Sequence, residues 1–336
     1  MAAGRATAIA PANIAFVKYW GVQDAALTLP YNESISMNLD RCLTTTTVQF
    51  DGRLDADEVV LKLHGQAEQP ARGRPLERVI AQLDRVRALA ATQIRARVHS
   101  TNNFPSDAGI ASSAAAFAAL TTAAVAALGL TLSEQELSVL TRRSGSGSAC
   151  RSIPTGFVHW RNDHTDGGSY AVSVAPPEHW ALADVVAVVD PGVKSVTSAD
   201  NHRLAATSPY FAVRLQEVPG RIQQALTAIR DHDLGQLGAV CESDAVSMHV
   251  VAMTAQPPTF YWNAGTLAVI HALRQWRNEG LFGYFTIDAG PNVHVICVQA
   301  DAVELERRLQ ALPEVQFTIA NGPGPGVRIV VDEPHA

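Results

Sequence analysis

The sequence predicts an α+β protein of two domains. Its 336 residues are too many for one small core and fit two domains of ordinary size. Strand patterns gather in two regions of the chain, and helices interleave with them without the strict strand-helix alternation of a parallel α/β fold. We therefore expect a first domain over residues 1–182 and a second over residues 183–336.

The first region contains β-branched or alternating stretches typical of strands, and one stretch with apolar residues at helical spacing. Ser133 and Glu136 have the spacing of a capping box and predict the start of a further helix. Asp-Gly-Gly and Pro-Pro within residues 161–180 indicate a connection around a hairpin. The strands are expected at 44–50, 59–63 and 94–100, and the helix at 76–91.

The second region begins with an apolar stretch that predicts a strand and continues into long helical patterns. Shorter apolar stretches after them predict further strands on either side of one more helix. The strands are expected at 185–189, 283–287, 293–298 and 327–331, and the helices within 208–252, 261–280 and 302–312.

The most informative local feature is the polar loop that runs from Asn102 into an alanine-rich helix ending near Leu128. The first N–H groups of a helix have no partner within the helix and carry the positive end of its dipole, so they favour phosphate. Gly109 would let the backbone approach a ligand. The same residues also fit an ordinary turn followed by a helix with Ser112 as its N-cap, and this alternative stays open at this point.

No charged residue lies between Asp107 and Glu134, which predicts an almost wholly buried helix. A membrane span is the competing interpretation of such a run. Alanine, serine and threonine supply most of it and Gly129 ends it, so a core helix is favoured.

The composition is that of a soluble globular protein, with 47% hydrophobic residues and a net charge of −6. No basic stripe is present to neutralise a nucleic-acid backbone, so no nucleic-acid partner is expected. The apolar N-terminal stretch contains a proline and fits neither a signal nor a transit peptide, so we expect a cytoplasmic protein without a membrane anchor. Cysteines and histidines lack metal-ligand spacing, and no metal site built by the protein is expected.

Three further segments have residues suited to chemistry on anions. Lys18 stands in an otherwise apolar segment, where the alternative is a lysine that extends to the surface. Arg151 follows a run of serines and glycines that offers hydroxyl and backbone donors, or forms a flexible linker. Asp288 follows a short apolar strand, where catalytic acids often lie and turn-forming aspartates also occur. Together with the polar loop, these residues suit phosphoryl transfer to a hydroxyl on a carboxylate-bearing substrate.

With these segments in view, the chain resembles the mevalonate phosphate decarboxylases, relatives of the GHMP kinases. The matching segments are Ala-Pro-Ala-Asn-Ile-Ala with Lys-Tyr-Trp-Gly, Asn-Asn-Phe-Pro-Ser-Asp-Ala-Gly-Ile-Ala-Ser-Ser-Ala-Ala, Ser-Gly-Ser-Ala-Cys-Arg-Ser, and Ile-Asp-Ala-Gly-Pro-Asn. They occupy residues 10–21, 102–115, 146–152 and 287–292, in the family's order. The resemblance spans nearly the whole chain.

The resemblance implies a GHMP-kinase-like fold, with a left-handed βαβ crossover in the N-terminal nucleotide-binding domain, a ferredoxin-like C-terminal domain, and usually a homodimer. It also implies ATP with Mg²⁺, the metal being recruited mainly by the nucleotide. The residues implied for ATP are Asn102, Pro105, Ser106, Asp107, Gly109, Ala111, Ser112 and Ser113.

The implied reaction is ATP-dependent decarboxylation of a 5-phosphorylated mevalonate in isoprenoid biosynthesis. Asp288 would accept or orient the C3 hydroxyl proton, Lys18 would orient Asp288 or the phosphoryl group, and Arg151 would hold the substrate carboxylate. The catalytic set is therefore Asp288, Lys18, Arg151 and Ser113, and the other residues implied for the substrate are Tyr19, Ser146, Gly147 and Ser148.

The chain departs from the family pattern around the substrate's phosphate end. Val22 stands where members acting on mevalonate 5-diphosphate typically have a second lysine, Glu33 where a serine is usual, and Asp107 where alanine is frequent. All three changes make the site less positive, which favours mevalonate 5-phosphate and the product isopentenyl phosphate. Two alternatives stay open: Asp107 could instead help to hold Mg²⁺ or cap the loop, and Glu33 could point to solvent. Mevalonate 5-diphosphate is the alternative if arginines such as Arg72, Arg74 or Arg78 replace the lysine.

Other classes of function are less well supported. A kinase that stops at the 3-phosphorylated product is the nearest rival, and a nucleotide-binding regulator without catalysis is a second. A serine hydrolase built on Ser113 or Ser148 is a third, although no motif places a histidine and an acid beside either serine.

Overall fold

The structure, a computed structural model, describes residues 4–105, 110, 112–192 and 198–330. Two long antiparallel strands, β1 (Arg5–Val17) and β4 (Ser34–Phe50), form the centre of the first sheet. The order of its main path is β14-β1-β4-β7-β5-β6, and the β8-β9 hairpin pairs with the first part of β4. The remaining strands are β5 (Glu58–Lys62), β6 (Gln69–Pro70), β7 (Ala96–Asn102), β8 (Phe157–Asn162), β9 (Ser169–Ala175) and β14 (Arg328–Val330).

Helices pack on the first sheet. β5 and β7 are parallel and α1 (Gly73–Leu89) connects them, which gives the expected βαβ crossover. α2 (Ser112–Ala127) lies against the sheet, and its buried apolar side chains join those of α1, β4 and β7 in one core. α3 (Glu134–Arg142) and the 3₁₀ helix η1 (Gly147–Ser152) follow.

The second sheet has the order β11-β12-β10-β13, with all neighbours antiparallel. Together with its helices it follows a βαββαβ path, which is the ferredoxin-like arrangement. Its strands are β10 (Leu182–Val188), β11 (Tyr284–Thr286), β12 (Val293–Val298) and β13 (Phe317–Asn321). The helices are α4 (Ser198–Leu204), α5 (Phe211–Asp231), α6 (Leu234–Thr254), α7 (Ala264–Asn278) and α8 (Ala302–Gln310). Shorter elements are β2 (Val22–Asp24), β3 (Leu29–Pro30), η2 (Pro177–His179), η3 (Ala205–Thr207) and η4 (Gln299–Asp301).

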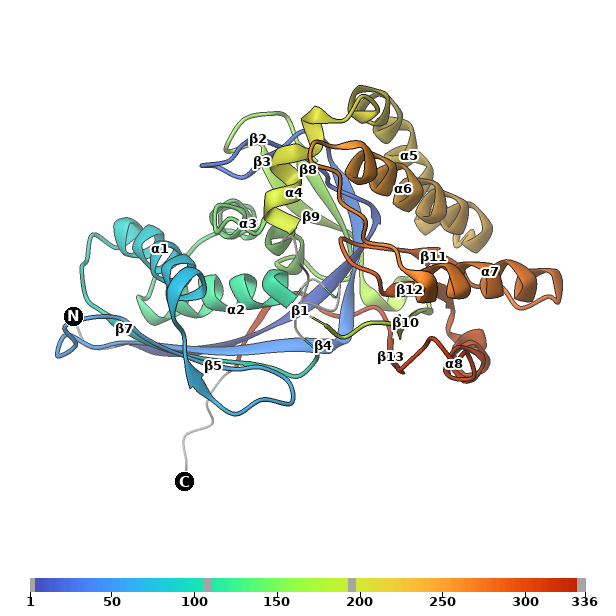
Figure 1. Cartoon of the computed structure of the whole chain (residues 1–336). Coiled ribbons are helices and arrows are strands. Elements are labelled where there is room, and N and C mark those ends of the chain that lie inside the picture. Colours follow the sequence, from blue (N-terminus) through green and yellow to red (C-terminus); the bar gives the residue numbers. More distant parts are fainter. Residues whose placement is uncertain (1–3, 106–109, 111, 193–197, 331–336) are drawn as a thin grey trace.

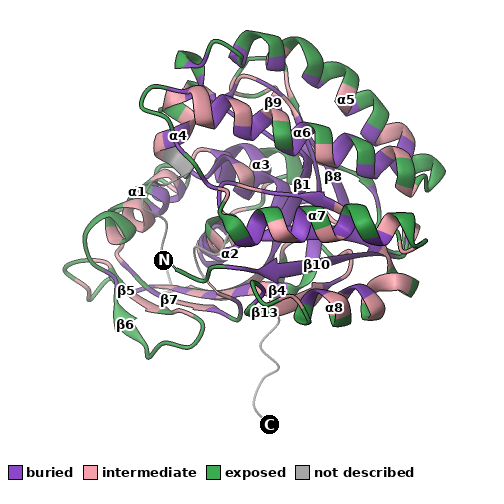
Figure 2. Cartoon of the chain, turned by 45° about the vertical axis from the view of Figure 1, so that its right-hand side comes forward, coloured by how far each residue is buried: buried purple, intermediate pink, exposed green. Residues whose placement is uncertain are grey.

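The two sheets share a core. Alternate residues of β10 face opposite sides: Val185 packs with α7 and α8, whereas Val186 packs with α5, α6 and the N-terminal strands. β1 and β4 therefore connect the part that contains α1 and α2 with the part that contains α5 to α8 (Figure 1). Figure 2 shows that the central strands are mostly buried, whereas the outer faces of the surrounding helices are exposed.

Most elements predicted from periodicity are confirmed, and the differences have physical causes. The patterns do not predict β1, because its residues are buried on both faces and show no alternation. The single helical stretch predicted within 208–252 is two helices, since His232 has a left-handed φ of 57° and Asp233 caps the next helix. The last strand, β14, returns to the first sheet, and the domain boundary after residue 182 stays a prediction.

The buried helix belongs to the core. α2 is 16 residues long, and 12 of its residues are buried. Among the residues that the structure describes, no helix combines the length and hydrophobicity that crossing a membrane requires. The interpretation of this run as a core helix is confirmed.

The predicted capping box at α3 is confirmed and gives a stability prediction. Ser133 Oγ accepts the Glu136 N–H at 3.3 Å, and the Glu136 carboxylate accepts the Ser133 N–H at 2.8 Å. Replacing Ser133 by Ala should lower the free energy of unfolding by about 1 kcal/mol in chemical denaturation. Ser243→Ala, at an exposed site within α6, is the control and should not lower it. Equal losses in both variants would contradict the capping assignment.

Candidate active site

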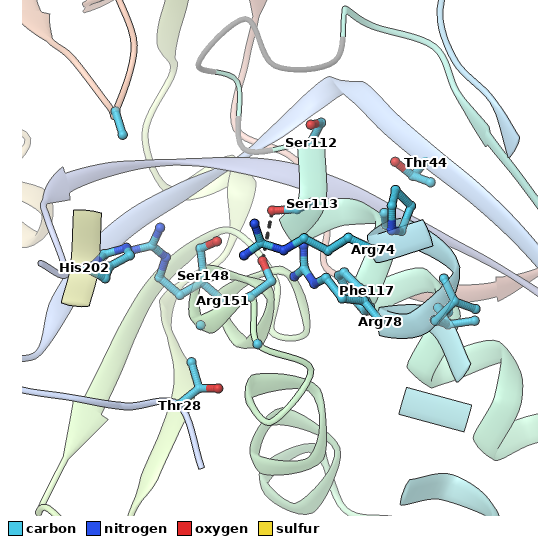
Figure 3. A pocket seen from close by; sticks show the side chains of 18 of the residues that line it. Thr28, Thr44, Arg74, Arg78, Ser112, Ser113, Phe117, Ser148, Arg151 and His202 are labelled. Atoms are coloured by element: carbon cyan, nitrogen blue, oxygen red, sulfur yellow. Dashed lines mark hydrogen bonds between the residues drawn. The ribbon is translucent and has the colours of Figure 1, made fainter. Parts of the chain in front are cut away.

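A cavity of about 600 Å³ lies where β1, α2, η1 and α4 approach one another. In Figure 3, His202, Ser148 and Arg151 lie toward one side of it, and Arg74, Arg78 and Phe117 toward the other. The N-terminus of α2 lies between the two sides. The two sides are named for the roles that the sequence resemblance implies. The first, the substrate lobe, is lined by Tyr19, Val22, Ser148, Arg151, His202 and Asp288. The second, the nucleotide lobe, is lined by Leu61, Leu63, Arg78, Val79, Phe117 and Leu120.

Asp288 lines the substrate lobe and forms an ion pair with Lys18, which lies behind it and is not itself a lining residue. Lys18 Nζ lies 2.5 Å from Asp288 Oδ1 and donates a second hydrogen bond to Ala15 O at 2.7 Å. The lysine side chain is only 4% exposed, so the interpretation of Lys18 as a surface lysine is wrong. Burial raises the pKa of Asp288, but the Lys18 ammonium, His294 and Arg151 outweigh it and hold this pKa below its ordinary value.

A second buried ion pair fixes the backbone of Lys18. The Lys18 N–H donates to Asp244 Oδ2 at 2.6 Å, and its carbonyl accepts a hydrogen bond from Arg214 Nη2 at 2.8 Å. Arg214 and Asp244 are themselves paired at 2.9 Å, from α5 and α6. Two helices that are far from Lys18 in the sequence therefore position this lysine. Neither Arg214 nor Asp244 belongs to a motif recognised in the sequence, where each is only a charged residue within a predicted helix.

Arg151 is a buried cation whose remaining donors face the cavity. Its Nε donates to Asn13 Oδ1 at 3.0 Å, and its Nη1 donates to Ser34 Oγ at 3.0 Å. Burial lowers its pKa from the ordinary arginine value. Across the described parts of the chain, no carboxylate lies within salt-bridge distance of its guanidinium. A guanidinium held by two neutral partners in a cavity wall can receive an external carboxylate or phosphate.

The structure describes part of the predicted phosphate loop. α2 begins at Ser112, and the hydroxyls of Ser113 and Ser146 lie 3.0 Å apart, which connects the helix N-terminus to the segment before η1. Asn102 lines the cavity, where its side chain accepts a hydrogen bond from Thr44. Pro105 precedes the loop and is partly exposed. The predictions for Ser106, Asp107, Gly109 and Ala111 lie outside the described residues.

The nucleotide lobe is an apolar slot between α1, α2 and the strands β5 and β7. Phe117 projects from α2, and the Arg78 guanidinium lies 4.5 Å from the centre of its ring. Leu61 and Val98 contribute from the strands. An apolar slot near a helix N-terminus suits a nucleoside whose phosphates lie at that terminus.

Tyr19 and the serine segment form a compact wall in the substrate lobe. The Tyr19 ring packs against Trp160 with 4.8 Å between ring centres. Gly147 lies so close to both rings that a Cβ there would be 2.8 Å from Trp160 and 3.1 Å from Tyr19. Ser146 and Ser148, on either side of this glycine, line the cavity. The structure thus brings together Tyr19, Ser146, Gly147 and Ser148, as the sequence predicts.

The three departures from the family pattern have different positions. Val22 lines the substrate lobe. Glu33 does not: its carboxylate pairs with His159 Nε2 at 3.2 Å and accepts the Asn162 N–H at 3.2 Å. The hydrogen bond from His159 holds the pKa of Glu33 below its ordinary value. The Glu33 carboxylate is therefore held by these two partners and is not among the residues that line the cavity. Its effect on the charge of the substrate site stays a prediction, and Asp107 lies outside the described residues.

Of the three arginines that were candidates to replace the lysine, Arg74 and Arg78 line the cavity. Arg74 also lies 3.6 Å from Asp200 of α4. Arg72 is not among the lining residues, so it is not a replacement. Among the described residues, no group of three or more histidine, cysteine, aspartate or glutamate side chains is arranged to hold a metal ion.

Comparisons with known proteins show which family the two parts of the chain match. Residues 10–171 match the family model of the diphosphomevalonate decarboxylase-like N-terminal domain, and residues 184–320 match that of the mevalonate 5-diphosphate decarboxylase C-terminal domain. A diphosphomevalonate decarboxylase of Candida albicans is 37% identical, over 88% of this chain and 85% of the relative. A phosphomevalonate decarboxylase of Haloferax volcanii is 35% identical, over 87% of each chain.

A solved structure of a similar protein extends the agreement to the fold. The complex of MDDEF with MVAPP, AMPPCP and magnesium matches with a TM-score of 0.89 and 36% identity, over 98% of this chain and 99% of that one. The GHMP-kinase-like α+β fold expected from the sequence is confirmed by this match and by the two sheets described above.

Proposed function

The chain belongs to the mevalonate phosphate decarboxylase family, and we propose that it converts a 5-phosphorylated mevalonate, with ATP, into an isopentenyl phosphate ester, ADP, phosphate and carbon dioxide. The observation that carries this proposal is the convergence of three groups on one cavity. These are the Lys18–Asp288 pair, the buried Arg151 without a carboxylate partner, and the N-terminus of α2. A kinase alone has no need for the second buried cation, since Arg151 suits the carboxylate that is lost.

The proposed chemistry begins at the C3 hydroxyl. Asp288, ionised beside Lys18, accepts the hydroxyl proton as the oxygen attacks the γ-phosphorus of ATP and the bond to ADP breaks. The C3–O bond then breaks, and the electron pair leaves with phosphate. The bond between C2 and the carboxylate breaks next, and its electrons form the new carbon-carbon double bond as carbon dioxide leaves. Arg151 orients the carboxylate until that step.

ATP fits the nucleotide lobe. The base would occupy the apolar slot beside Phe117, and the phosphates would lie at the start of α2, with the hydroxyls of Ser112 and Ser113 as donors or ligands. The Ser113–Ser146 hydroxyl pair offers neutral oxygen ligands, which suits a Mg²⁺ ion that is held mainly by the nucleotide. Bound there, Mg²⁺ would neutralise charge on the transferring phosphoryl group.

The number of phosphates on the substrate has two candidates. The names of the relatives favour mevalonate 5-diphosphate, because most are diphosphomevalonate decarboxylases and one is a phosphomevalonate decarboxylase. Arg74 and Arg78 also line the cavity, but they lie toward the nucleotide lobe (Figure 3) and not beside Val22. One observation favours mevalonate 5-phosphate: Val22, in the wall of the substrate lobe, supplies no charge where a lysine is typical of diphosphate users.

The deciding experiment measures ATP- and Mg²⁺-dependent carbon dioxide release by the purified protein, with the two mevalonate phosphates side by side. Release with the diphosphate at the higher kcat/KM supports the first candidate, and a preference for the monophosphate supports the second. Consumption of ATP without carbon dioxide would leave the rival kinase, and release of neither product would refute the decarboxylase. The homodimer and the cytoplasmic location stay predictions.

A substitution at Val22 tests the electrostatic argument. Val22→Lys should raise the ratio of kcat/KM for the diphosphate over the monophosphate by at least tenfold. A charge at about 4 Å is worth on the order of 4 kcal/mol at an effective dielectric constant near 20, and desolvation reduces that figure. Val22→Met is the control for size and should leave the ratio unchanged. An unchanged ratio in the lysine variant would show that this position does not read the phosphate charge.

A further inference from the structure

His202 lies in the wall of the substrate lobe, at a position for which the sequence motifs assign no role. It belongs to α4 and lines the cavity together with Tyr19, Arg151 and Asp288. Its ring stacks on Tyr19 with 4.1 Å between ring centres and 19° between planes, and it lies 4.6 Å from Trp20. Two aromatic contacts therefore fix the plane of the imidazole.

The hydrogen bond at Nδ1 fixes the tautomer. The Gly21 N–H donates to His202 Nδ1 at 3.0 Å, and a backbone amide is always the donor. Nδ1 is therefore unprotonated, and the neutral ring carries its proton on Nε2. Gly21 holds this geometry with a φ of 92°, and a Cβ at this position would lie 2.7 Å from Phe211.

The ring is uncharged at neutral pH. Burial, with the nearby Arg151 guanidinium, lowers the pKa of His202 to about 3. Its Nε2–H is thus a neutral donor of fixed direction. Within the described part of the chain, this N–H has no hydrogen-bond partner, although Nδ1 is satisfied. An oriented donor without a partner in a polar cavity wall is suited to a ligand acceptor.

The neighbours of His202 indicate which part of the substrate it meets. Under the proposed function, Arg151 holds the carboxylate and Asp288 meets the C3 hydroxyl. Tyr19, on which the ring stacks, and Val22, which follows the Gly21 contact, form the remaining wall of the lobe. That wall is left for the 5-phosphate end.

We propose that His202 binds the 5-phosphate end of the substrate, donating its Nε2–H to a phosphate oxygen. This inference rests on the proposed function, since it requires a 5-phosphorylated substrate in the lobe. A neutral donor contributes one hydrogen bond to a monophosphate and to a diphosphate alike. His202 therefore sets affinity for the phosphate end, whereas position 22 sets preference between the two charge states.

The test separates the donor from the ring. His202→Phe keeps an aromatic ring for the stack and removes the donor, whereas His202→Gln keeps an N–H near the Nε2 position and loses the ring. His271→Phe, at an exposed site on α7, is the remote control. Calorimetric titration would measure the Kd of mevalonate 5-phosphate and of mevalonate 5-diphosphate without ATP, and steady-state kinetics would measure the KM of ATP.

His202→Phe should raise both Kd values about 10- to 100-fold, the effect of one hydrogen bond to a charged group, and leave the KM of ATP within about twofold. His202→Gln should recover most of the affinity. The reverse order, with Phe harmless and Gln harmful, would show a purely structural ring and overturn the inference. An equal rise in the KM of ATP would also overturn it. If the wild-type protein is active and the Kd values of His202→Phe are unchanged, the inference about His202 is refuted while the proposed function stands. If the wild-type protein binds neither mevalonate phosphate, both the inference and the proposed function are refuted.

Discussion

Replacing Asp288 by Asn should lower kcat for carbon dioxide release by about a thousandfold or more, with a smaller effect on the KM of either substrate. Proton acceptance by a positioned carboxylate contributes about 10²- to 10⁴-fold to a rate, and an amide cannot accept the proton. The change also removes the anion that pairs with Lys18 at 2.5 Å, so a lysine buried to 4% exposure loses its partner. The measurement is single-turnover decarboxylation at saturating ATP.

The control for this variant is Asp55→Asn, at an exposed site, which should retain full activity. Circular dichroism should show that Asp288→Asn is folded, so that lost activity reflects chemistry. Residual activity within tenfold of the wild type would refute Asp288 as the proton acceptor. ATP turnover without carbon dioxide in this variant would place Asp288 after the phosphoryl transfer.

The pH profile of the wild-type enzyme follows from the same residue. The pKa of Asp288 is held below its ordinary value, so its active, ionised form persists as the pH falls through the usual aspartate range. We therefore expect no acidic limb from Asp288 between pH 7 and pH 5.

Replacing Arg151 by Gln should lower kcat/KM for the mevalonate phosphate by about 10²- to 10³-fold. Loss of one partner of a buried, hydrogen-bonded charge pair costs about 2–5 kcal/mol. Steady-state kinetics at saturating ATP would measure this effect. Arg151→Lys should recover only part of it, because the ammonium keeps the charge but cannot reproduce the bonds to Asn13 and Ser34 together with a two-point contact to a carboxylate.

Replacing Arg151 should lower activity without lowering the thermal stability of the protein. The substrate-free protein keeps this guanidinium buried without a carboxylate partner among the described residues, which is unfavourable. Thermal melting of Arg151→Gln should therefore show a Tm no lower than that of the wild type, whereas Arg41→Gln, an exposed control, should change neither Tm nor activity. A strongly lowered Tm would indicate that Arg151 serves the fold rather than the substrate.

Local signals were sufficient for most of the elements and for the list of candidate residues. The capping box at Ser133 depends only on residues three positions apart, so it can be predicted from the sequence alone. The long charge-free run predicted the buried α2 because burial of a whole helix excludes charge from every face. The strand β1 could not be predicted in this way, because a strand that is buried on both faces has no alternation of apolar and polar residues.

Contacts between distant segments were beyond such signals. Glu33 was expected to lower the charge of the substrate site because it stands where the family usually has a serine, but its carboxylate pairs with His159 on the neighbouring strand β8. His202 had no motif, and it became a candidate only through its stack on Tyr19 and its bond from Gly21. Both are long-range pairings, which depend on how strands and helices pack.

The sequence by itself determined the family, the α+β class and the list of candidate site residues, because motif identity and periodicity are local properties of a chain. Only the tertiary structure decided which charges are paired. It joined Lys18 to Asp288 across 270 positions, left Arg151 with neutral partners, and paired Glu33 with His159. The physical reason is that the energy of a buried charge depends on its neighbours in space, and these are brought together by packing of the two sheets.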